Sequence, residues 1–442
     1  MYNIQDTIAA FATSNVGGAV AVLRLSGALT YQILNKLTKK EFTPRMATLA
    51  TIYDGNDILD KAIIIYYKAS KSYTGEDVAE ISLHAGPYIK SRILELCLAL
   101  GARNARAGEF SQRAFLNGKI DLVEAQGVLD IIAAKNKAAH KAAVNSLEGR
   151  LSNRFKQIRQ NLTDILAQVE VRIDDTDGEM QSLPQEETKN SLLKVAQEAK
   201  TLADTFSSGR LVKEGIKVAL CGVTNAGKSS LLNKLLGYNR AIVSSQAGTT
   251  RDTVEAPLSL FGFDLVLIDT AGIRKTTTDE AEIEGINRSR QAIEQADITI
   301  FVRDLTLQDK TEENKFFNEV RQSAKNLITV FNKADKIDFK EINGIIISAK
   351  TGQGLENLEK EIIKTLNLGN ISGQEVIITS AAHYKALLAA ALELESATEK
   401  LADLELCAEH LRIALKELKE LIGEVTSEDI LDTIFSKFCV GK

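Results

Sequence analysis

Residues 222–229 read Gly-Val-Thr-Asn-Ala-Gly-Lys-Ser, a complete G-x-x-x-x-G-K-[ST] loop. An apolar run at 216–220 precedes it and is expected to be a buried strand, and an apolar helical pattern at 231–236 follows it. A strand that leads through a glycine-rich turn into a helix points backbone N–H groups and the positive helix end at one place, which suits polyphosphate. We expect Lys228 to reach the β and γ phosphates and Ser229 to bind Mg²⁺. An ordinary tight turn is the alternative.

Three further segments, each after an apolar run, indicate which nucleotide binds. They are Asp269 to Gly272, Asn332 to Asp335, and Ser348 to Lys350. The Asp335 carboxylate can accept from the two adjacent N–H donors of guanine. Adenine lacks this pair of donors, so ATP would leave the buried carboxylate unpaired and would be excluded. A backbone N–H of 348–350 would meet the guanine carbonyl. Each segment alone is compatible with a surface turn, but their order predicts a GTPase domain.

Length and charge limit the other possibilities. At 442 residues the chain is expected to contain about three domains. A formal charge of −5 argues against coating nucleic acid by bulk electrostatics, so any RNA contact would be local. Neither a basic leader nor a membrane-length apolar run is visible, which predicts a cytoplasmic protein. The cysteines are too far apart to suggest a disulfide framework or a zinc site: Cys97, Cys221, Cys407 and Cys439.

The texture of the chain predicts a multidomain α/β protein. Residues 1–118 are expected to form an α+β domain, with strands near 19–25, 62–67 and 78–83. Residues 119–212 are expected to form the first part of a helical bundle, and 371–442 its second part. The GTPase domain, 213–370, with its α/β sheet and flanking helices, would then be inserted within the helical domain.

The helical prediction depends on one apolar stripe. Apolar residues at 147, 151, 155, 158, 162, 165 and 169 step by three or four, which keeps them on one side of a long helix. A polar break at 174–189 is expected to end this helix. A second helix is expected through 192–206.

Several motifs are similar to those of the tRNA-modification GTPase family known as MnmE or TrmE, and the similarity covers essentially the whole chain. Departures are Ala85 and Ala107, where the family usually has Gly and Pro, and Val440, where Ile is usual. The matching segments are Asp6 to Ala10, Gly17-Gly18, Arg24 to Gly27, Ser72 to Asp77, Gly108 to Lys119, Ala247 to Asp252 (switch I) and Phe438 to Lys442.

The resemblance implies a function. A member would work as a homodimer, assembled with the FAD-dependent protein MnmG in a heterotetramer. It would install an aminomethyl or carboxymethylaminomethyl group at C5 of the wobble uridine of certain tRNAs, with a one-carbon unit from 5,10-methylene- or 5-formyltetrahydrofolate. The N-terminal domain would both bind folate and dimerise.

The resemblance also assigns residues to the folate site. Arg24, Glu80, Lys119 and Lys442 would contact the folate, since a carboxylate accepts from the pterin donors and cations suit its acidic end. Each is otherwise a surface charge. Cys439 is either a catalytic thiol brought to this site or a small buried apolar residue.

Hydrolysis would need an unusual arrangement. Ile273 follows the 269–272 segment where small GTPases commonly place a water-orienting Gln. The resemblance gives that role to Glu282, with Glu280 and Glu284 as competing assignments. Asn225 offers an oxygen to a monovalent cation beside the phosphates, or else only caps its own turn.

In the family that cation is K⁺, which would neutralise developing charge as an arginine finger does. Its further ligands would be carbonyls of Ser244, Gln246 and Thr249, and Thr250 would bind Mg²⁺. The complete set expected around GTP is Asn225, Ala226, Gly227, Lys228, Ser229, Ser230, Ser244, Ser245, Gln246, Ala247, Gly248, Thr249, Thr250, Asp269, Thr270, Ala271, Gly272, Asn332, Lys333, Asp335, Ser348, Ala349 and Lys350.

Two other functions remain compatible with these patterns. One is a K⁺-dependent GTPase switch in ribosome assembly, although such proteins usually carry a basic RNA-binding domain. The other is a folate-dependent transferase in which GTP only regulates.

Overall fold

The computed structural model describes residues 6–13, 18–175, 181–238, 255–260, 263–269, 291–337, 344–366, 368, 376–424 and 428–441. The chain divides into two compact units. The first contains residues 1–129, 146–164 and 412–442, and the second contains residues 130–145 and 165–411.

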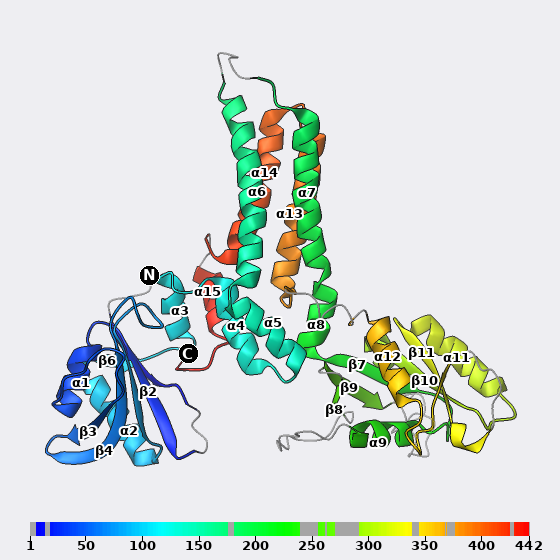
Figure 1. Cartoon of the computed structure of the whole chain (residues 1–442), viewed down its shortest axis with the longest axis horizontal. Helices are drawn as coiled ribbons and strands as arrows, with labels where there is room; N and C mark the ends of the chain where they lie inside the picture. Colours follow the sequence, from blue (N-terminus) through cyan, green and yellow to red (C-terminus); the bar gives the residue numbers. More distant parts are fainter. Residues whose placement is uncertain are drawn as a thin grey trace. The chain divides into compact units, whose positions relative to one another are not determined.

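The first unit is built on a six-stranded sheet of order β3-β4-β5-β2-β1-β6, antiparallel except for β1 beside β6 (Figure 1). Its β2 and β5 alternate buried and more open positions, and the buried face packs on α1 and α2. The three strands expected near 19–25, 62–67 and 78–83 are confirmed. The bounds are β1 Thr7–Phe11, β2 Val20–Ser26, α1 Thr30–Thr38, β3 Thr48–Asp54, β4 Asp57–Tyr67, β5 Val78–His84, α2 Pro87–Ala99, β6 Ala102–Asn104 and α3 Glu109–Leu116.

Helix α15, Glu428–Phe435, returns the chain to this unit from far along the sequence. Leu431 and Phe435 pack with Leu122 and Ala125, which lie at the start of α4, Leu122–Ala133. Phe438 joins the same apolar cluster. The residues after α15 are thereby held within the unit that contains the N-terminal sheet.

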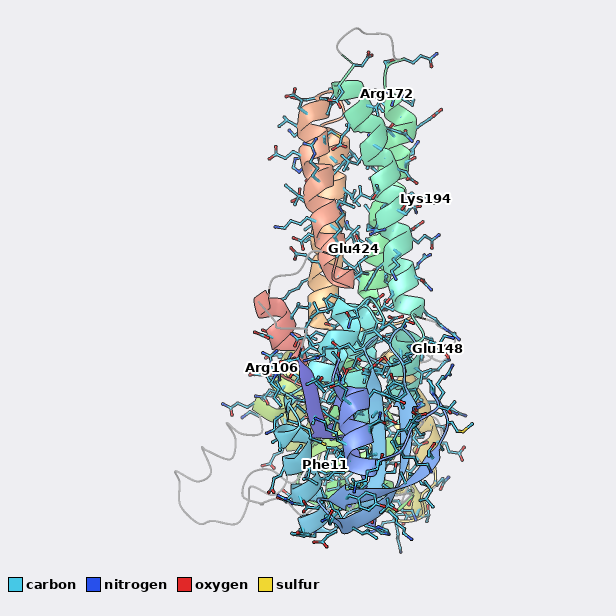
Figure 2. All side chains as sticks on the ribbon, turned by 90° about the vertical axis from the view of Figure 1, so that its left-hand side faces the viewer. Phe11, Arg106, Glu148, Arg172, Lys194 and Glu424 are labelled. Carbon is cyan, nitrogen blue, oxygen red and sulfur yellow. The ribbon has the colours of Figure 1, made fainter. Side chains whose placement is uncertain are left out.

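Outside the two sheets, most of the described residues between 137 and 214 and between 381 and 422 are helical. These helices are α5 Lys137–Leu147, α6 Arg150–Ile173, α7 Gln185–Asp204, α8 Phe206–Glu214, α13 Ala381–Glu399 and α14 Leu404–Ile422. Helices α7 and α13 pack along each other, although the whole second sheet lies between them in sequence. Charged side chains such as Lys194 project outward from the helices (Figure 2). The inserted arrangement is confirmed, whereas the domain boundaries stay predictions.

Two details of the predicted helices are wrong. Leu147 does not begin the long stripe but ends α5, because Gly149 (φ +73°) breaks the chain before α6. The expected break at 174–189 is shorter, because α7 already begins at Gln185. The remaining stripe residues from 151 to 169 are buried.

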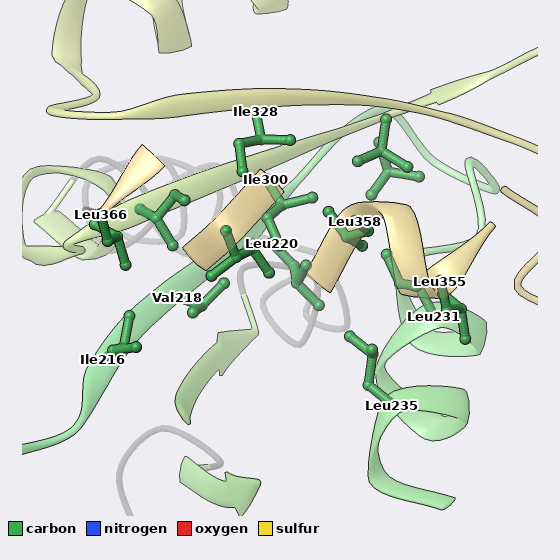
Figure 3. Packing of buried hydrophobic residues seen from close by; sticks show 14 of the residues in the cluster. Ile216, Val218, Leu220, Leu231, Leu235, Ile300, Ile328, Leu355, Leu358 and Leu366 are labelled. Atoms are coloured by element: carbon green, nitrogen blue, oxygen red, sulfur yellow. The ribbon is translucent and has the colours of Figure 1, made fainter. Parts of the chain in front are cut away.

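The second sheet has the order β12-β11-β10-β7-β9-β8, parallel except for β8. Central strand β7 is buried at five of its six positions, and its apolar side chains pack against those of β10, α9 and α12 (Figure 3). Ligands of such sheets bind at the carboxyl ends of the strands. The bounds are β7 Ile216–Cys221, α9 Lys228–Tyr238, β8 Glu255–Leu260, β9 Phe263–Asp269, β10 Ile298–Asp304, α11 Thr311–Ser323, β11 Leu327–Asn332, η1 Ala334–Lys336, β12 Ile345–Ile346 and α12 Leu355–Thr365.

Candidate functional site

The 222–229 loop has a backbone that only glycine allows at two places. Gly222 has φ +145°, and a Cβ there would lie 2.3 Å from the Val302 carbonyl oxygen. Gly227 has φ +95°, and a Cβ there would lie 2.1 Å from Nδ2 of Asn332. Asn225 adopts the left-handed conformation and is exposed. The loop therefore follows β7 closely and presents Asn225 outward, as a cation ligand in this loop requires.

Lys228 begins α9 and folds back over the loop. Its Nζ donates to the carbonyl oxygens of Gly222 at 2.8 Å and Val223 at 2.9 Å. The ammonium thus lies over the same backbone that would hold phosphates. Ser229 and Ser230 follow in the first helical turn and are exposed, so the Ser229 hydroxyl fits the Mg²⁺ role.

The side chain of Asn332 connects its own motif, 332–335, to the 222–229 loop and to the 348–350 segment. Only 2% of its surface is exposed. Its Nδ2 donates to the Ala226 carbonyl oxygen at 2.8 Å, and its Oδ1 accepts from the Ala349 N–H at 2.9 Å. The 332–335, 222–229 and 348–350 segments therefore meet at one buried amide, which fixes the loop expected to hold phosphate relative to the segments expected to hold the base.

Asp335 stands where a base-recognising carboxylate is needed. Ser348 donates its hydroxyl to Asp335 Oδ1 at 2.6 Å, and this bond lowers the pKa of the Asp335 carboxyl. The carboxylate is exposed and ionised at neutral pH, as an acceptor for guanine must be. Lys350 is likewise exposed.

Lys333 has a partner that the sequence did not suggest. Its Nζ contacts Asp304 Oδ2 at 2.5 Å, at the end of β10. Burial would raise the pKa of the Asp304 carboxyl, but Lys333 and Thr306 together lower it. An Asp two residues after the largely apolar run 298–302 was the available signal, since the other site residues also follow strands.

Several expected nucleotide contacts cannot be placed. Asp269 ends β9 and pairs in register with Leu220, next to the loop, but only its backbone is described. The following residues lie outside the described part of the chain: Ser244, Ser245, Gln246, Ala247, Gly248, Thr249, Thr250, Thr270, Ala271, Gly272, Glu280, Glu282, Glu284 and Lys442.

The predicted folate residues Arg24 and Glu80 are brought together on the N-terminal sheet. They are cross-strand partners of β2 and β5. Arg24 donates from Nη2 and Nε to Glu80 Oε1 at 2.8 and 3.1 Å. Both are partly exposed, so the sheet offers a carboxylate and a guanidinium side by side on the face opposite the core.

Lys119 lies against the loop of residues 70–76. Its Nζ donates to the Ser70 carbonyl oxygen at 2.9 Å. Asn117 donates from Nδ2 to the Thr74 carbonyl oxygen at 2.7 Å, so the 117–119 segment is fastened to this loop at two points. Tyr73 of the same loop has its ring centroid 5.7 Å from the Arg24 guanidinium carbon. The loop connects Lys119 to the Arg24–Glu80 pair.

Residues 438–441, the terminal segment, dock on the same unit. Val440 forms an antiparallel bridge with Ala107, so these two departures from the family pattern face each other. The Gly441 carbonyl oxygen accepts from Arg24 Nη1 at 3.2 Å. Gly441 has φ +99°, and a Cβ there would lie 2.1 Å from the Phe11 carbonyl oxygen.

Cys439 lies in this terminal segment and is exposed. The interpretation of Cys439 as a small buried apolar residue is therefore wrong. The alternative, a thiol that reaches the folate site, stays a prediction.

Four charged residues of the matching segments, Asp6, Glu76, Glu109 and Arg113, form one ion network. Arg113, 3% exposed, donates to Asp6, Glu76 and Glu109. Burial would raise the pKa of the Glu109 carboxyl, but Arg103, the Arg106 N–H and Arg113 lower it to about 2. The network connects β1, the 70–76 loop and α3, and it carries no folate role that the sequence assigned.

In the described part of the chain, every helix is too short or too polar to span a membrane.

The comparisons with known proteins cover nearly the whole sequence. The family described as "GTP-binding protein TrmE N-terminus" matches residues 7–119, and "MnmE helical domain" matches residues 122–439.

Two relatives carry the name "tRNA modification GTPase MnmE". The one from Aquifex aeolicus is 38% identical over 99% of this chain and 100% of its own. The one from Akkermansia muciniphila is 40% identical over 100% of both. A solved structure of Era from Aquifex aeolicus is 30% identical over 41% of this chain and 66% of its own, with a TM-score of 0.29. That score is too low to support an argument.

Proposed function

The chain belongs to the MnmE family of tRNA modification GTPases, and we propose that it modifies C5 of the wobble uridine with a one-carbon unit from tetrahydrofolate. It is a GTPase that acts in tRNA modification. The fold confirms the predicted class: an N-terminal α+β domain, a helical domain and an inserted P-loop GTPase domain. The observation that carries the proposal is that one chain contains two groups of polar side chains, one around Asn332 and, in the other unit, one around Arg24 and Glu80.

In the first site each group has a distinct task. The 222–229 backbone and Lys228 would hold the phosphates. Asp335 would accept from guanine, and Ser348 would hold the carboxylate at the correct angle through its 2.6 Å bond. Asn332 would keep the two ends at a fixed separation through one N–H and the oxygen of its amide, and its second N–H would still be available to the base.

Two cations would assist hydrolysis. Ser229 and Thr250 would hold Mg²⁺, and Asn225, with carbonyls of Ser244, Gln246 and Thr249, would hold K⁺. Asn225 is exposed and its backbone is in the left-handed conformation, which suits a side-chain ligand to K⁺. Bound K⁺ would supply positive charge beside the phosphates.

Glu282 would orient the attacking water. Glu282→Ala should slow hydrolysis while leaving GTP binding intact. A fully active variant would transfer the role to Glu280 or Glu284.

The second site fits a folate. The Glu80 carboxylate suits the amino and ring N–H groups of a pterin, and Arg24, Lys119 and Lys442 suit the acidic end. The terminal segment supports this assignment, because the Gly441 carbonyl oxygen accepts from Arg24. Bound 5,10-methylene- or 5-formyltetrahydrofolate would supply the one-carbon unit. Cys439, exposed within this segment, would act as the thiol.

The sheet itself supports a homodimer. Leu49 and Ile63 are cross-strand partners, 64% and 51% exposed, and Ile63 pairs in turn with Ser82 of β5. Directly paired residues share one face, so this apolar patch lies on the face that carries Glu80. We propose that two copies pair through this face, and that the dimer assembles with the FAD-dependent MnmG protein and tRNA in the cytoplasm.

Nucleoside mass spectrometry tests the whole proposal. tRNA from a deletion strain should lack aminomethyl derivatives at C5 of wobble uridine, and a plasmid copy should restore them. Glu80→Gln should fail to restore them, whereas Glu148→Gln, at an exposed position outside both sites, should succeed. Wild-type levels of the derivatives in the deletion strain would overturn the assignment.

A further inference from the structure

Tyr73 is partly exposed between two buried neighbours. Ser72 and Thr74 are 8% and 0% exposed, whereas Tyr73 is 36% exposed. The polar neighbours face inward because each has a partner: Ser72 Oγ donates to the Glu76 carbonyl oxygen, and Thr74 Oγ1 shares a 2.7 Å hydrogen bond with Ser26. The 70–76 loop therefore buries its small polar residues and leaves an aromatic ring at the surface.

The ring is held in place before any ligand binds. Its hydroxyl shares a 2.8 Å hydrogen bond with Ser111 Oγ on α3. The loop that carries it is fastened by Asn117 and Lys119. A ring with a fixed orientation loses little side-chain entropy when a ligand stacks on it, which favours binding.

The position of the ring matches the candidate folate site. The Arg24 guanidinium carbon lies 5.7 Å from the centroid of Tyr73 and 5.6 Å from that of the buried Phe110. The same guanidinium contacts Glu80 at 2.8 Å. An aromatic surface thus adjoins the carboxylate that suits pterin donors, and a flat bicyclic ring needs both.

We propose that Tyr73 is the stacking surface for the pterin ring of the folate. The proposal rests on the proposed folate function and adds a binding residue to it. Phe110 supports Arg24 from within the core and is too buried to stack on a ligand. Stacking on an aromatic side chain contributes about 1–3 kcal/mol per base-sized ring.

The test measures binding of 5-formyltetrahydrofolate to the full-length protein by calorimetry. Tyr73→Ala should weaken binding about tenfold, and Tyr73→Leu, which keeps apolar bulk, should also weaken it. Tyr73→Phe should stay within about threefold of the unmodified protein, because it loses only the bond to Ser111. Tyr88→Ala removes a tyrosine that is 70% exposed elsewhere in the same domain and should change nothing.

Two fragments identify the part of folate that stacks. The loss in Tyr73→Ala should be seen with 6-methyltetrahydropterin, which contains only the ring, and should be absent with p-aminobenzoylglutamate, which lacks it. Equal binding by Tyr73→Ala, Tyr73→Leu and the unmodified protein would overturn the stacking role and leave the folate site standing. A loss seen only with p-aminobenzoylglutamate would also overturn it. An unmodified protein that binds no folate would overturn both proposals.

Discussion

Replacement of Asn332 by Ala should damage the GTPase site by unpairing the two loops that its side chain joins. The Asn332 amide donates to the Ala226 carbonyl oxygen and accepts from the Ala349 N–H, and both of those residues are at most 5% exposed. Asn332→Ala leaves one buried acceptor and one buried donor unpaired. We therefore expect a loss of stability together with a loss of alignment between the two loops.

The magnitude follows from the number of groups left unpaired. A buried polar group without a partner costs about 1–3 kcal/mol, so two such groups cost about 2–6 kcal/mol. Whole domains are stable by only about 5–15 kcal/mol, so the variant would be strongly destabilised. Asn332→Asp should be as harmful, because it keeps the acceptor for Ala349 but sets a carboxylate against the Ala226 carbonyl oxygen.

Two measurements on the full-length protein separate the effects. Thermal unfolding with and without GDP reports stability, and titration with a fluorescent GDP reports affinity, which should fall at least about tenfold. Asn326→Ala is the matched control, because Asn326 donates one 2.9 Å bond to the Asp297 carbonyl oxygen in the same domain. It should cost about 1 kcal/mol and leave affinity unchanged. Unchanged unfolding and affinity in Asn332→Ala would refute the reasoning.

Further expectations concern the base, the cation, acid and the terminal segment. Asp335→Asn should lower GTP affinity and raise that for xanthosine triphosphate; equal discrimination by calorimetry would contradict the guanine role. Hydrolysis should be much faster in KCl than in NaCl at equal ionic strength, and Asn225→Ala should remove that difference while GTP still binds. The lowered pKa of Glu109, about 2 against an ordinary 4.5, stabilises the fold above about pH 4.5 and progressively less as pH falls toward 2, by an amount on the order of 3 kcal/mol. Unfolding of Glu109→Gln and the unmodified protein should converge over that range. Gly441→Ala should weaken folate binding, since its Cβ would meet the Phe11 carbonyl oxygen, whereas Gly55→Ala, with φ +65° and no atom within 4 Å, should not.

Much of the GTPase site could be predicted because its chemistry is local in sequence. A strand, a glycine turn and a helix dictate the 222–229 geometry, and apolar runs located the other motifs at strand ends. The partners of these residues could not be predicted. The contact of Asn332 with GTP stays a prediction. The structure adds that its amide joins two loops whose distance depends on the packed sheet.

The helix boundaries were less predictable for a different reason. From apolar spacing alone, Leu147 was predicted to lie in the same helix as the apolar stripe of α6. The Gly149 turn separates the two helices, and it adjoins the Glu124 carboxylate, a neighbour set by tertiary structure. Likewise, Tyr73 lies in a segment that matches the family, but no role could be assigned to it from the sequence. Its proposed stacking role depends on its position beside Arg24, which lies on a strand distant in sequence.

The contact between Arg24 and Gly441 has a consequence for how the protein is made. The two residues are 417 positions apart. Ribosomes add about 5–20 residues per second, so tens of seconds separate their synthesis. The N-terminal sheet can emerge and fold early, but the proposed folate site waits for a segment that is translated after the GTPase domain. A chain released just before the terminal segment would still contain the residues proposed to bind guanine and phosphate, yet would lack the carbonyl oxygen that meets Arg24.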